Sequence, residues 1–228
     1  MQMAKKERVV VVISAKNEER TIKDAIKRSE PYADKIMVVL SKNSSDNTGK
    51  ISRAMGAEVI VDGGRGKGEG MRLAIRKISD GIIVFMDADG SHIPEDIPKV
   101  IAPIKEGRAD MVIASRMLGG SMELHGTFNK LLRFTLSMMI AQIINWRFRT
   151  AIADTQNGFR SIKLKVARDL KLKANKFDIE TEMVMKCYKK GYKVLEVPSM
   201  ELERKYGKSG ISLLKEGWAY LWRVIANL

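Results

Sequence analysis

Short apolar runs alternate with amphipathic segments through the first half of the chain. Runs rich in Val, Ile, Met and Leu predict buried strands at residues 9–13, 36–40, 57–61 and 81–86. Apolar residues at helical spacing between these runs predict helices at 17–28, about 46–55 and about 69–78. This alternation predicts an α/β fold with a Rossmann-like, mostly parallel sheet and helices on both faces.

The second half is less regular. A helix is expected after 94–96, and a fifth strand at 110–114. Further helices are predicted at 131–146, 177–190 and 211–228, with a strand at 193–197. Because no linker-like or repeated segment interrupts the sequence, we expect one domain over residues 1–228.

The charge balance indicates an anionic partner. Lysine and arginine number 41 against 27 acidic residues, a formal charge of +14, which suits nucleic acid, a phosphorylated substrate or an anionic membrane. No zinc spacing or aromatic pattern typical of RNA-binding sheets is present, so nucleic acid is not expected. The single cysteine, Cys187, excludes a disulfide framework and favours a cytoplasmic location.

Two apolar segments bear on membrane contact. The run 134–144 includes Thr135, Ser137 and Gln142, and it is well short of the ~20 residues that span a bilayer. The N-terminal residues lack an apolar signal sequence, so a soluble or peripheral protein is expected. The helix at 211–228 pairs leucine and tryptophan with basic residues, which fits either core packing or a membrane interface.

An Asp87-Ala88-Asp89 triplet follows the fourth predicted strand directly. Two carboxylates in one turn form a hard-oxygen site for Mg²⁺ or Mn²⁺, which would hold a diphosphate; the alternative is a solvated acidic turn. Loops at 15–18 and 41–43 follow neighbouring strands, so all three loops should meet in one crevice.

The glycine-rich segment 63–70 could present N–H groups and cations to phosphate, or be only a turn.

The order of the motifs resembles the family 2 inverting glycosyltransferases of GT-A fold, among them the polyprenyl-phosphate sugar synthases such as dolichyl-phosphate mannose synthases. The resemblance covers residues 9 to about 214. The matching segments are 12–19 (VISAKNEE), 44–48 (SSDNT), 67–70 (KGEG), 86–95 (MDADGSHIPE), 115–116 (SR), 154–160 (DTQNGFR), 182–183 (EM), 196–198 (EVP) and 204–209 (RKYGKS).

The resemblance implies a nucleotide-sugar half at about 8–116 and an acceptor-side half at about 117–228. It implies that the donor, a GDP- or UDP-sugar, contacts Ala15, Asn17, Glu18, Ser41, Lys67, Asp87, Ala88 and Asp89. The chain has Ser41-Lys42-Asn43-Ser44 where the family usually has Asp-Asp-Gly-Ser. The base is therefore left open.

The same resemblance implies a metal site. Asp89 would coordinate a Mg²⁺ or Mn²⁺ ion that bridges the diphosphate, with Asp87 near the ribose and the metal. Ser91 stands where mannose synthases have a glutamine metal ligand, and a hydroxyl is a weaker ligand. His92 is expected either to ligate or to make a hydrogen bond within the turn.

Cationic residues are implied at the phosphates of the donor and of the lipid acceptor. They are Arg116, Arg133 with Ser137, Arg204 and Lys208. A forked guanidinium suits phosphate. Asp154 and Glu182 are the acidic candidates on the acceptor side, and each either acts as a base for a hydroxyl acceptor or pairs with basic residues.

The resulting hypothesis is a metal-dependent inverting glycosyltransferase, with Asp89, Arg116, Arg204 and Asp154 as its candidate catalytic residues. It would transfer a sugar from a nucleotide-diphosphate sugar to a polyprenyl phosphate at the cytosolic membrane face. One alternative keeps the donor but takes a soluble or protein-bound acceptor. The other, suggested by the missing carboxylates and glutamine, is a catalytically weak nucleotide-sugar or phospholipid binding module.

Overall fold

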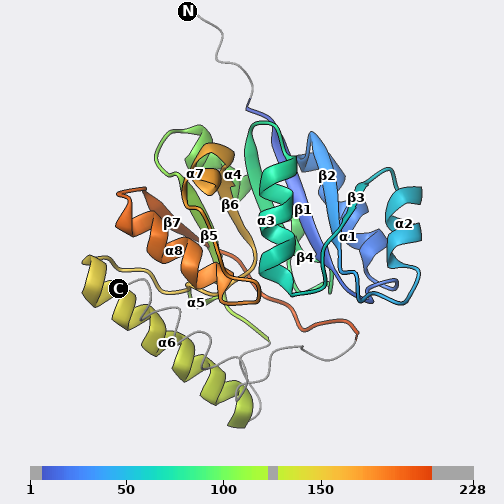
Figure 1. Cartoon of the computed structure of the whole chain (residues 1–228). Coiled ribbons are helices and arrows are strands. Elements are labelled where there is room, and N and C mark those ends of the chain that lie inside the picture. Colours follow the sequence, from blue (N-terminus) through green and yellow to red (C-terminus); the bar gives the residue numbers. More distant parts are fainter. Residues whose placement is uncertain (1–6, 123–127, 207–228) are drawn as a thin grey trace, which may run out of the picture.

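The computed structural model describes residues 7–122 and 128–206, and within them a seven-stranded sheet (Figure 1). Its strand order is β3-β2-β1-β4-β6-β5-β7. The strands are β1 (Val9–Ala15), β2 (Lys35–Leu40), β3 (Glu58–Val61), β4 (Ile82–Asp87), β5 (Met111–Ser115), β6 (Arg160–Lys163) and β7 (Val194–Pro198). The predicted helix at 211–228 and Lys208 lie outside the described residues.

The sheet is mostly parallel, as the sequence predicted. β1 pairs in parallel with β2 and β4, β2 with β3, and β5 with β7. β6 was not predicted; it runs antiparallel between β4 and β5. Because the strands of this parallel set point the same way, the loops after β1, β2, β3 and β4 open at one edge of the sheet.

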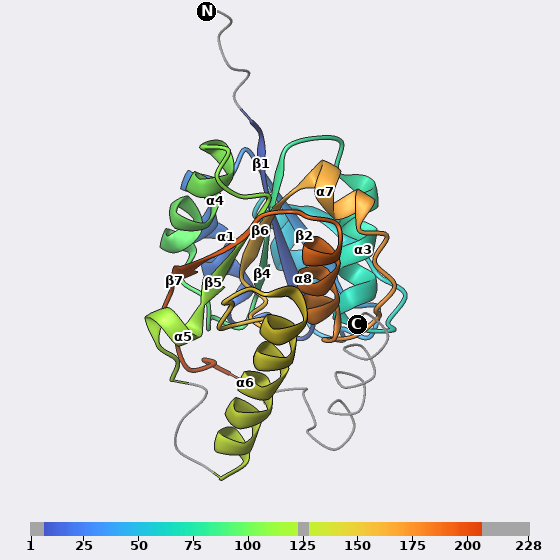
Figure 2. The ribbon, with the colours of Figure 1, turned by 90° about the vertical axis from the view of Figure 1, so that its left-hand side faces the viewer.

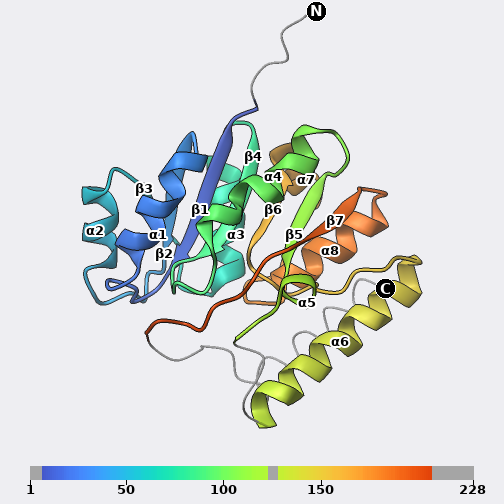
Figure 3. The ribbon, with the colours of Figure 1, turned by 180° about the vertical axis from the view of Figure 1, so that it is seen from behind.

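Helices cover both faces of the sheet (Figures 1 and 3). On one face lie α1 (Ile22–Ser29), α2 (Thr48–Ala54) and α4 (Ile97–Lys105); on the other lie α3 (Lys67–Lys77), α7 (Leu164–Asp169) and α8 (Ile179–Lys189). The remaining helical segments are α5 (Arg116–Gly119), α6 (Phe128–Phe148) and the 3₁₀ turns η1 (Glu30–Tyr32) and η2 (Pro94–Asp96).

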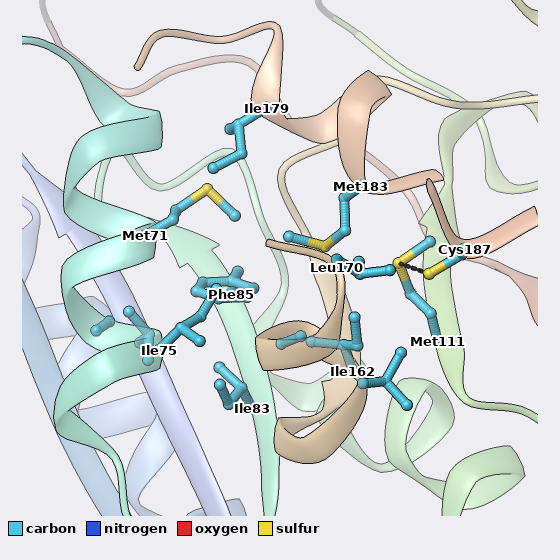
Figure 4. Packing of buried hydrophobic residues seen from close by; sticks show 14 of the residues in the cluster. Met71, Ile75, Ile83, Phe85, Met111, Ile162, Leu170, Ile179, Met183 and Cys187 are labelled. Atoms are coloured by element: carbon cyan, nitrogen blue, oxygen red, sulfur yellow. Dashed lines mark hydrogen bonds between the residues drawn. The ribbon is translucent and has the colours of Figure 1, made fainter. Parts of the chain in front are cut away.

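Strand side chains divide between two buried clusters because successive residues point to opposite faces. On one face of the sheet, Val9, Val11 and Ile13 belong to a cluster with residues of α1 and α4. On the other face, Val10 and Val12 belong to a second cluster with residues of α3 and α8. Figure 4 shows the second cluster, which joins the sheet to α3, α7 and α8. These two cores fix the sheet edge from which the site loops project.

Cys187 belongs to this second cluster, with Sγ 4.0 Å from Met111 Sδ (Figure 4). Burial raises the pKa of the Cys187 thiol to about 12. The thiol is therefore neutral near pH 7, and it contributes packing rather than thiolate chemistry.

Helix α6 lies apart from the sheet, at one end of the molecule (Figures 1 and 2). Ala141 is buried, and Ile144 is buried in the second cluster. Several large apolar residues along the helix remain exposed: Leu131, Leu132, Leu136, Met138, Met139 and Trp146. Within 7–122 and 128–206, no helix is both long and apolar enough to cross a membrane.

Candidate active site

A cavity of about 830 Å³ opens at the carboxyl ends of β1, β2, β3 and β4. The structure brings together there these residues singled out from the sequence: Ala15, Asn17, Glu18, Ser41, Lys67, Asp87, Ala88, Asp89 and Arg204. Arg116, Ser137 and Asp154 do not line the cavity. The convergence of loops expected from the strand pattern is therefore confirmed.

Asn17 ties the first loop to the loop after β2. Its backbone has φ 55°, a left-handed conformation that asparagine tolerates better than most residues. The Asn17 side-chain oxygen accepts hydrogen bonds from Ser45 N at 2.8 Å and Ser44 Oγ at 3.2 Å. Glu18 N donates to Thr48 Oγ1 at 2.8 Å, which adds a second link between the two loops. The first wall of the cavity is thus held by side-chain to backbone contacts.

Asp62, directly after β3, is a cavity residue that the sequence analysis did not single out. Its Oδ1 accepts hydrogen bonds from Gly64 N at 2.7 Å and Lys42 N at 3.1 Å. Asp62 therefore places a carboxylate in the part of the cavity at the ends of β2 and β3, where Ser41 also lies. The only signal in the sequence was an acidic residue immediately after a predicted strand.

Arg204 reaches the cavity from the segment after β7. Leu202 N donates to Ser91 O at 2.9 Å and Lys205 N to Asp89 O at 3.2 Å, so the chain runs along the Asp87–Ser91 turn. Arg204 Nη2 lies 2.6 Å from Asp89 Oδ2 and its Nη1 lies 3.0 Å from Glu18 Oε1. One guanidinium thereby bridges carboxylates from two separate loops.

The environment of Glu18 favours its neutral form. Burial raises the pKa of Glu18 above its ordinary value, with Asp89 adding to the effect and Arg204 opposing it. The Glu18 side chain also accepts a hydrogen bond from Thr21 Oγ1 at 3.1 Å. Glu18 is thus a carboxylate whose charge depends on the nearby guanidinium.

Lys67, the first residue of α3, pairs with both Asp87 and Glu180. Its Nζ lies 2.7 Å from Asp87 Oδ1 and 3.0 Å from Glu180 Oε1. Burial acts to lower the pKa of Lys67, but the two carboxylates raise it above its ordinary value. For Asp87, burial acts to raise the pKa while Lys67 first, and Arg204 to a lesser degree, hold it below the usual range. Both groups are therefore charged at neutral pH.

The turn after β4 orders its own side chains. Ser91 Oγ donates a hydrogen bond to Asp89 Oδ1 at 2.7 Å, and Ser91 N donates to the same oxygen at 3.0 Å. His92 Nδ1 accepts a hydrogen bond from Asp87 N at 3.1 Å, and its ring stacks on Phe159. The turn hydrogen bond that the sequence analysis weighed for His92 is confirmed.

A divalent cation fits the donor set around Asp87 and Asp89. Mg²⁺ is commonly held by one or two carboxylates plus substrate phosphates, and these two side chains already attract Lys67 and Arg204. In the described part of the chain, no group of three or more His, Cys, Asp or Glu residues could hold a metal alone. The remaining ligands would therefore have to come from a bound diphosphate or from water.

Arg116 and Asp154 form a buried fork. Arg116 Nε lies 2.7 Å from Asp154 Oδ2 and its Nη2 lies 2.9 Å from Asp154 Oδ1. Burial acts to raise the pKa of Asp154, but Arg116 holds it below its ordinary value. Glu196 positions the turn by accepting hydrogen bonds from Ala153 N and Asp154 N, each at 2.7 Å. Of the two alternatives for Asp154, this geometry favours pairing over service as a base.

Glu182 is also engaged structurally. It lies 2.8 Å from Lys186 Nζ and accepts hydrogen bonds from the backbone of Lys173 and Ala174. Its carboxylate joins α8 to the segment after α7, away from the cavity lining. This placement too favours the pairing interpretation.

The remaining residues expected at the lipid phosphate are Ser137, Arg133 and Lys208. Ser137 is buried on α6, and its Oγ has no hydrogen-bond partner among the described residues. The side chain of Arg133 lies outside the described side chains, as Lys208 lies outside the described residues. The expected lipid-phosphate group therefore stays a prediction.

The glycine-rich loop at 63–70 is held mainly by its own contacts. Arg65 N donates to Glu69 Oε2 at 3.0 Å, and Arg65 Nε donates to Glu69 Oε1 at 2.8 Å. Glu69 N donates to Asn175 O at 3.0 Å, which links the loop to the segment before α8. These contacts fit the turn interpretation, with Lys67 as the cation that the loop presents.

The family model described as "Glycosyl transferase family 2" matches residues 10–170. The chain is 30% identical over 206 residues to Glycosyltransferase AglJ of Haloferax volcanii, covering 87% of this chain and 64% of AglJ. It is 26% identical over 226 residues to Undecaprenyl-phosphate mannosyltransferase of Micrococcus luteus, covering 90% of this chain and 88% of that protein.

A solved structure has the same fold. Glucosyl-3-phosphoglycerate synthase from Mycobacterium tuberculosis, in complex with Mn²⁺, uridine-diphosphate and phosphoglyceric acid, superposes with a TM-score of 0.72. The two chains are 21% identical, and the match covers 97% of this chain and 77% of that one. The GT-A fold expected from the motifs is confirmed.

Proposed function

This chain belongs to glycosyl transferase family 2, and we propose that it is a metal-dependent inverting glycosyltransferase. The proposed reaction transfers a sugar from a nucleotide-diphosphate sugar to a polyprenyl phosphate. The observation that carries the proposal is the bridge from Arg204 to Glu18 and Asp89 inside the cavity. It sets a guanidinium and a metal-ligating carboxylate side by side, where a diphosphate leaving group needs both.

The leaving group determines what the site must stabilise. When the sugar C1–O bond to the diphosphate breaks, the electron pair stays on the nucleoside diphosphate. A divalent ion held by Asp87 and Asp89 supplies Lewis-acid stabilisation of that charge when bound. Arg204 binds and orients the diphosphate, and Lys67 fixes Asp87. Loops 15–18 and 41–43 hold the nucleoside, with Asp62 beside them.

The contacts of Asp154 and Glu182 support a phosphate acceptor, which needs no base, rather than a hydroxyl acceptor. A lipid phosphate oxygen is ionised at pH 7, so it attacks the anomeric carbon without giving up a proton to a base. Asp154 and Glu182 are both engaged by cations and backbone groups, which leaves neither poised to deprotonate a hydroxyl. A single in-line displacement then inverts the anomeric centre. The M. luteus relative, by its name, acts on undecaprenyl phosphate, which supports this acceptor class.

The surface of α6 supports a peripheral position at a membrane surface. Met138, Met139 and Trp146 are 51%, 56% and 80% exposed, and Arg147 and Arg149 follow at the exposed end of the helix. Tryptophan and basic residues beside an apolar face are typical of helices that lie in a membrane interface. A membrane-bound acceptor explains why apolar side chains face outward on this helix.

A donor screen tests the proposal. UDP or GDP release would be followed with Mn²⁺ from a panel of UDP- and GDP-sugars, with and without polyprenyl phosphate in detergent. The proposal predicts release that rises with the lipid. Release indifferent to the lipid would move the acceptor to a soluble or protein-bound molecule, as in the phosphoglyceric acid complex of the structural neighbour. Tight donor binding without turnover would indicate a binding module.

A further inference from the structure

Glu180, at the start of α8, shares the Lys67 ammonium with Asp87. Lys67 Nζ lies 2.7 and 2.8 Å from the two Asp87 oxygens and 3.0 Å from Glu180 Oε1. Glu180 stands 113 residues after Lys67 in the sequence, counted from 67 to 180, and only the fold brings the two together. Glu180 does not line the cavity, so its effect on a ligand there must pass through Lys67.

Glu180 opposes the effect of burial on Arg160, whose pKa burial lowers and Glu180 raises, but this interaction explains its position only in part. Its side chain is 2% exposed, and its Oε2 has no hydrogen-bond partner among the described residues. A buried carboxylate with an unsatisfied oxygen is costly. An ammonium at the first turn of a helix is likewise unfavourable for the helix dipole.

The surroundings hold the three side chains together. The Lys67 ammonium lies 6.0 Å from the centre of the Phe177 ring, within reach of a cation–π interaction. At Gly158, an added Cβ would clash with Lys67 Nζ and lie 2.9 Å from Asp87 Oδ2. The missing side chain of Gly158 therefore leaves room for the Lys67–Asp87 pair.

Four carboxylates beside the proposed metal site share two cationic side chains. Among the described residues, Asp87 and Glu180 both pair with Lys67, and Glu18 and Asp89 both pair with Arg204. The charge of Lys67 is therefore divided between Asp87 and Glu180. Without Glu180, Asp87 would be the one ion-pair partner of Lys67 in the described part of the chain.

We propose that Glu180 is a positioning residue that draws on the charge of Lys67 and so leaves Asp87 able to bind a divalent cation. The inference rests on the proposed function, because it assigns Asp87 and Asp89 to the metal of that reaction. It concerns metal affinity, however, which is measured without any sugar transfer.

The test is a titration of Mn²⁺ alone, read from the loss of the electron paramagnetic resonance signal of the free ion. Glu180→Gln keeps the shape of the side chain and removes its charge. It should raise the Mn²⁺ dissociation constant by about tenfold or more, as expected for removing a unit charge near a partly buried ion. UDP and GDP binding measured in EDTA should not weaken.

Glu182→Gln is the matched control, because Glu182 is also buried on α8 but pairs with Lys186. It should lower thermal stability and leave the Mn²⁺ affinity unchanged. In the double variant Lys67→Met/Glu180→Gln, the net charge at Asp87 is restored. Its Mn²⁺ affinity should return to within about threefold of the wild type, a strong non-additivity.

Unchanged Mn²⁺ affinity in Glu180→Gln, or an equal loss in Glu182→Gln, would overturn the inference. If Glu180→Gln fails to fold, Lys67→Met alone decides: it should strengthen Mn²⁺ binding, and unchanged or weaker binding would contradict the charge argument. Absence of Mn²⁺ binding by the wild-type protein, alone and with UDP or GDP, would overturn it too. Normal Mn²⁺ results with no transfer from any donor would instead reject the proposed function and leave the role of Glu180 intact.

Discussion

Arg204 lies between Glu18 and Asp89, with Nη1 3.0 Å from Glu18 Oε1 and Nη2 2.6 Å from Asp89 Oδ2. The guanidinium thus lies beside the carboxylate assigned to the metal, close to where the negative diphosphate would bind. A bound diphosphate would offer Arg204 a third anionic partner, and the planar guanidinium can bind phosphate through two N–H groups. The same relationship makes Arg204 the most informative residue to change.

Arg204→Ala should lower kcat/KM for sugar transfer by about 10²- to 10³-fold, the usual loss when one stabilising donor is removed from a transition state. Its side chain is 26% exposed, so the free energy of unfolding should fall by only about 1 kcal/mol or less. Steady-state kinetics and urea unfolding measure the two effects. Lys205→Ala, which removes the exposed pair with Asp24, is the control. A stability loss that accounts for the lost activity would make Arg204 structural.

Asp89→Asn should abolish metal-dependent donor binding, because an amide oxygen is a poorer ligand for a hard cation than a carboxylate. Calorimetry with UDP or GDP would be done with Mn²⁺ and again with EDTA. In the variant the two affinities should coincide, whereas wild-type affinity should drop when EDTA removes the metal. Asp24→Asn, a nearby exposed carboxylate, should behave as the wild type. A metal effect that survives in Asp89→Asn would remove Asp89 from the metal site.

Asp154→Asn should destabilise the fold by about 3–5 kcal/mol, the usual cost of leaving one partner of a buried ion pair uncompensated. The carboxylate is fully buried and held by Arg116, so the loss should appear in urea unfolding at pH 7. Transfer per folded molecule should stay within the same order of magnitude. Wild-type stability with transfer lost would support the base alternative instead.

The stability difference between wild type and Asp154→Asn should depend on pH. The pKa of Asp154 is lowered in the folded protein, so its stabilising contribution is full above the unfolded pKa of about 3.9. It is lost as the pH falls through the lower folded value. Unfolding curves of the two proteins should therefore converge below about pH 4. A difference that grows on acidification would have the wrong sign.

Met138→Glu and Met139→Glu on α6 should each reduce sedimentation with anionic vesicles that contain polyprenyl phosphate, because a carboxylate opposes insertion into the interface. Both side chains are more than half exposed, so unfolding free energies should change by less than about 0.5 kcal/mol. Val61→Glu is the matched control, since Val61 is 49% exposed on the edge strand β3. Equal loss of binding in all three variants would reflect net charge rather than α6.

Much of the sheet could be predicted from the sequence because its strands are uninterrupted apolar runs. β6 could not be, since Arg160-Ser161-Ile162-Lys163 contains a single apolar residue. Its buried Arg160 is accommodated by backbone carbonyls, including Glu180 O at 2.9 Å and Thr155 O at 3.2 Å. Tertiary contacts of this kind leave no local pattern.

The strand pattern alone predicted the part of the site that lies in the loops after β1, β2 and β4, whereas Lys67 and Arg204 were expected from the family resemblance. Asp87 and Asp89 come directly after an apolar run, and their shared loop edge follows from parallel topology. The pairing of Lys67 with Glu180 joins α3 to α8, and the fork of Arg116 with Asp154 joins α5 to the segment before β6. Such long-range pairs decide which carboxylates are free and which are neutralised.

The most direct test of the proposed function is the transfer of radiolabelled sugar from the donor found in the screen into an organic-extractable lipid. The assay compares polyprenyl phosphate with the unphosphorylated polyprenol, with Mn²⁺ and with EDTA. We expect labelled lipid only with the phosphate and the metal together, and its loss in Arg204→Ala. Label that stays in the aqueous phase, with donor turnover unaffected by the lipid, would contradict a polyprenyl phosphate acceptor.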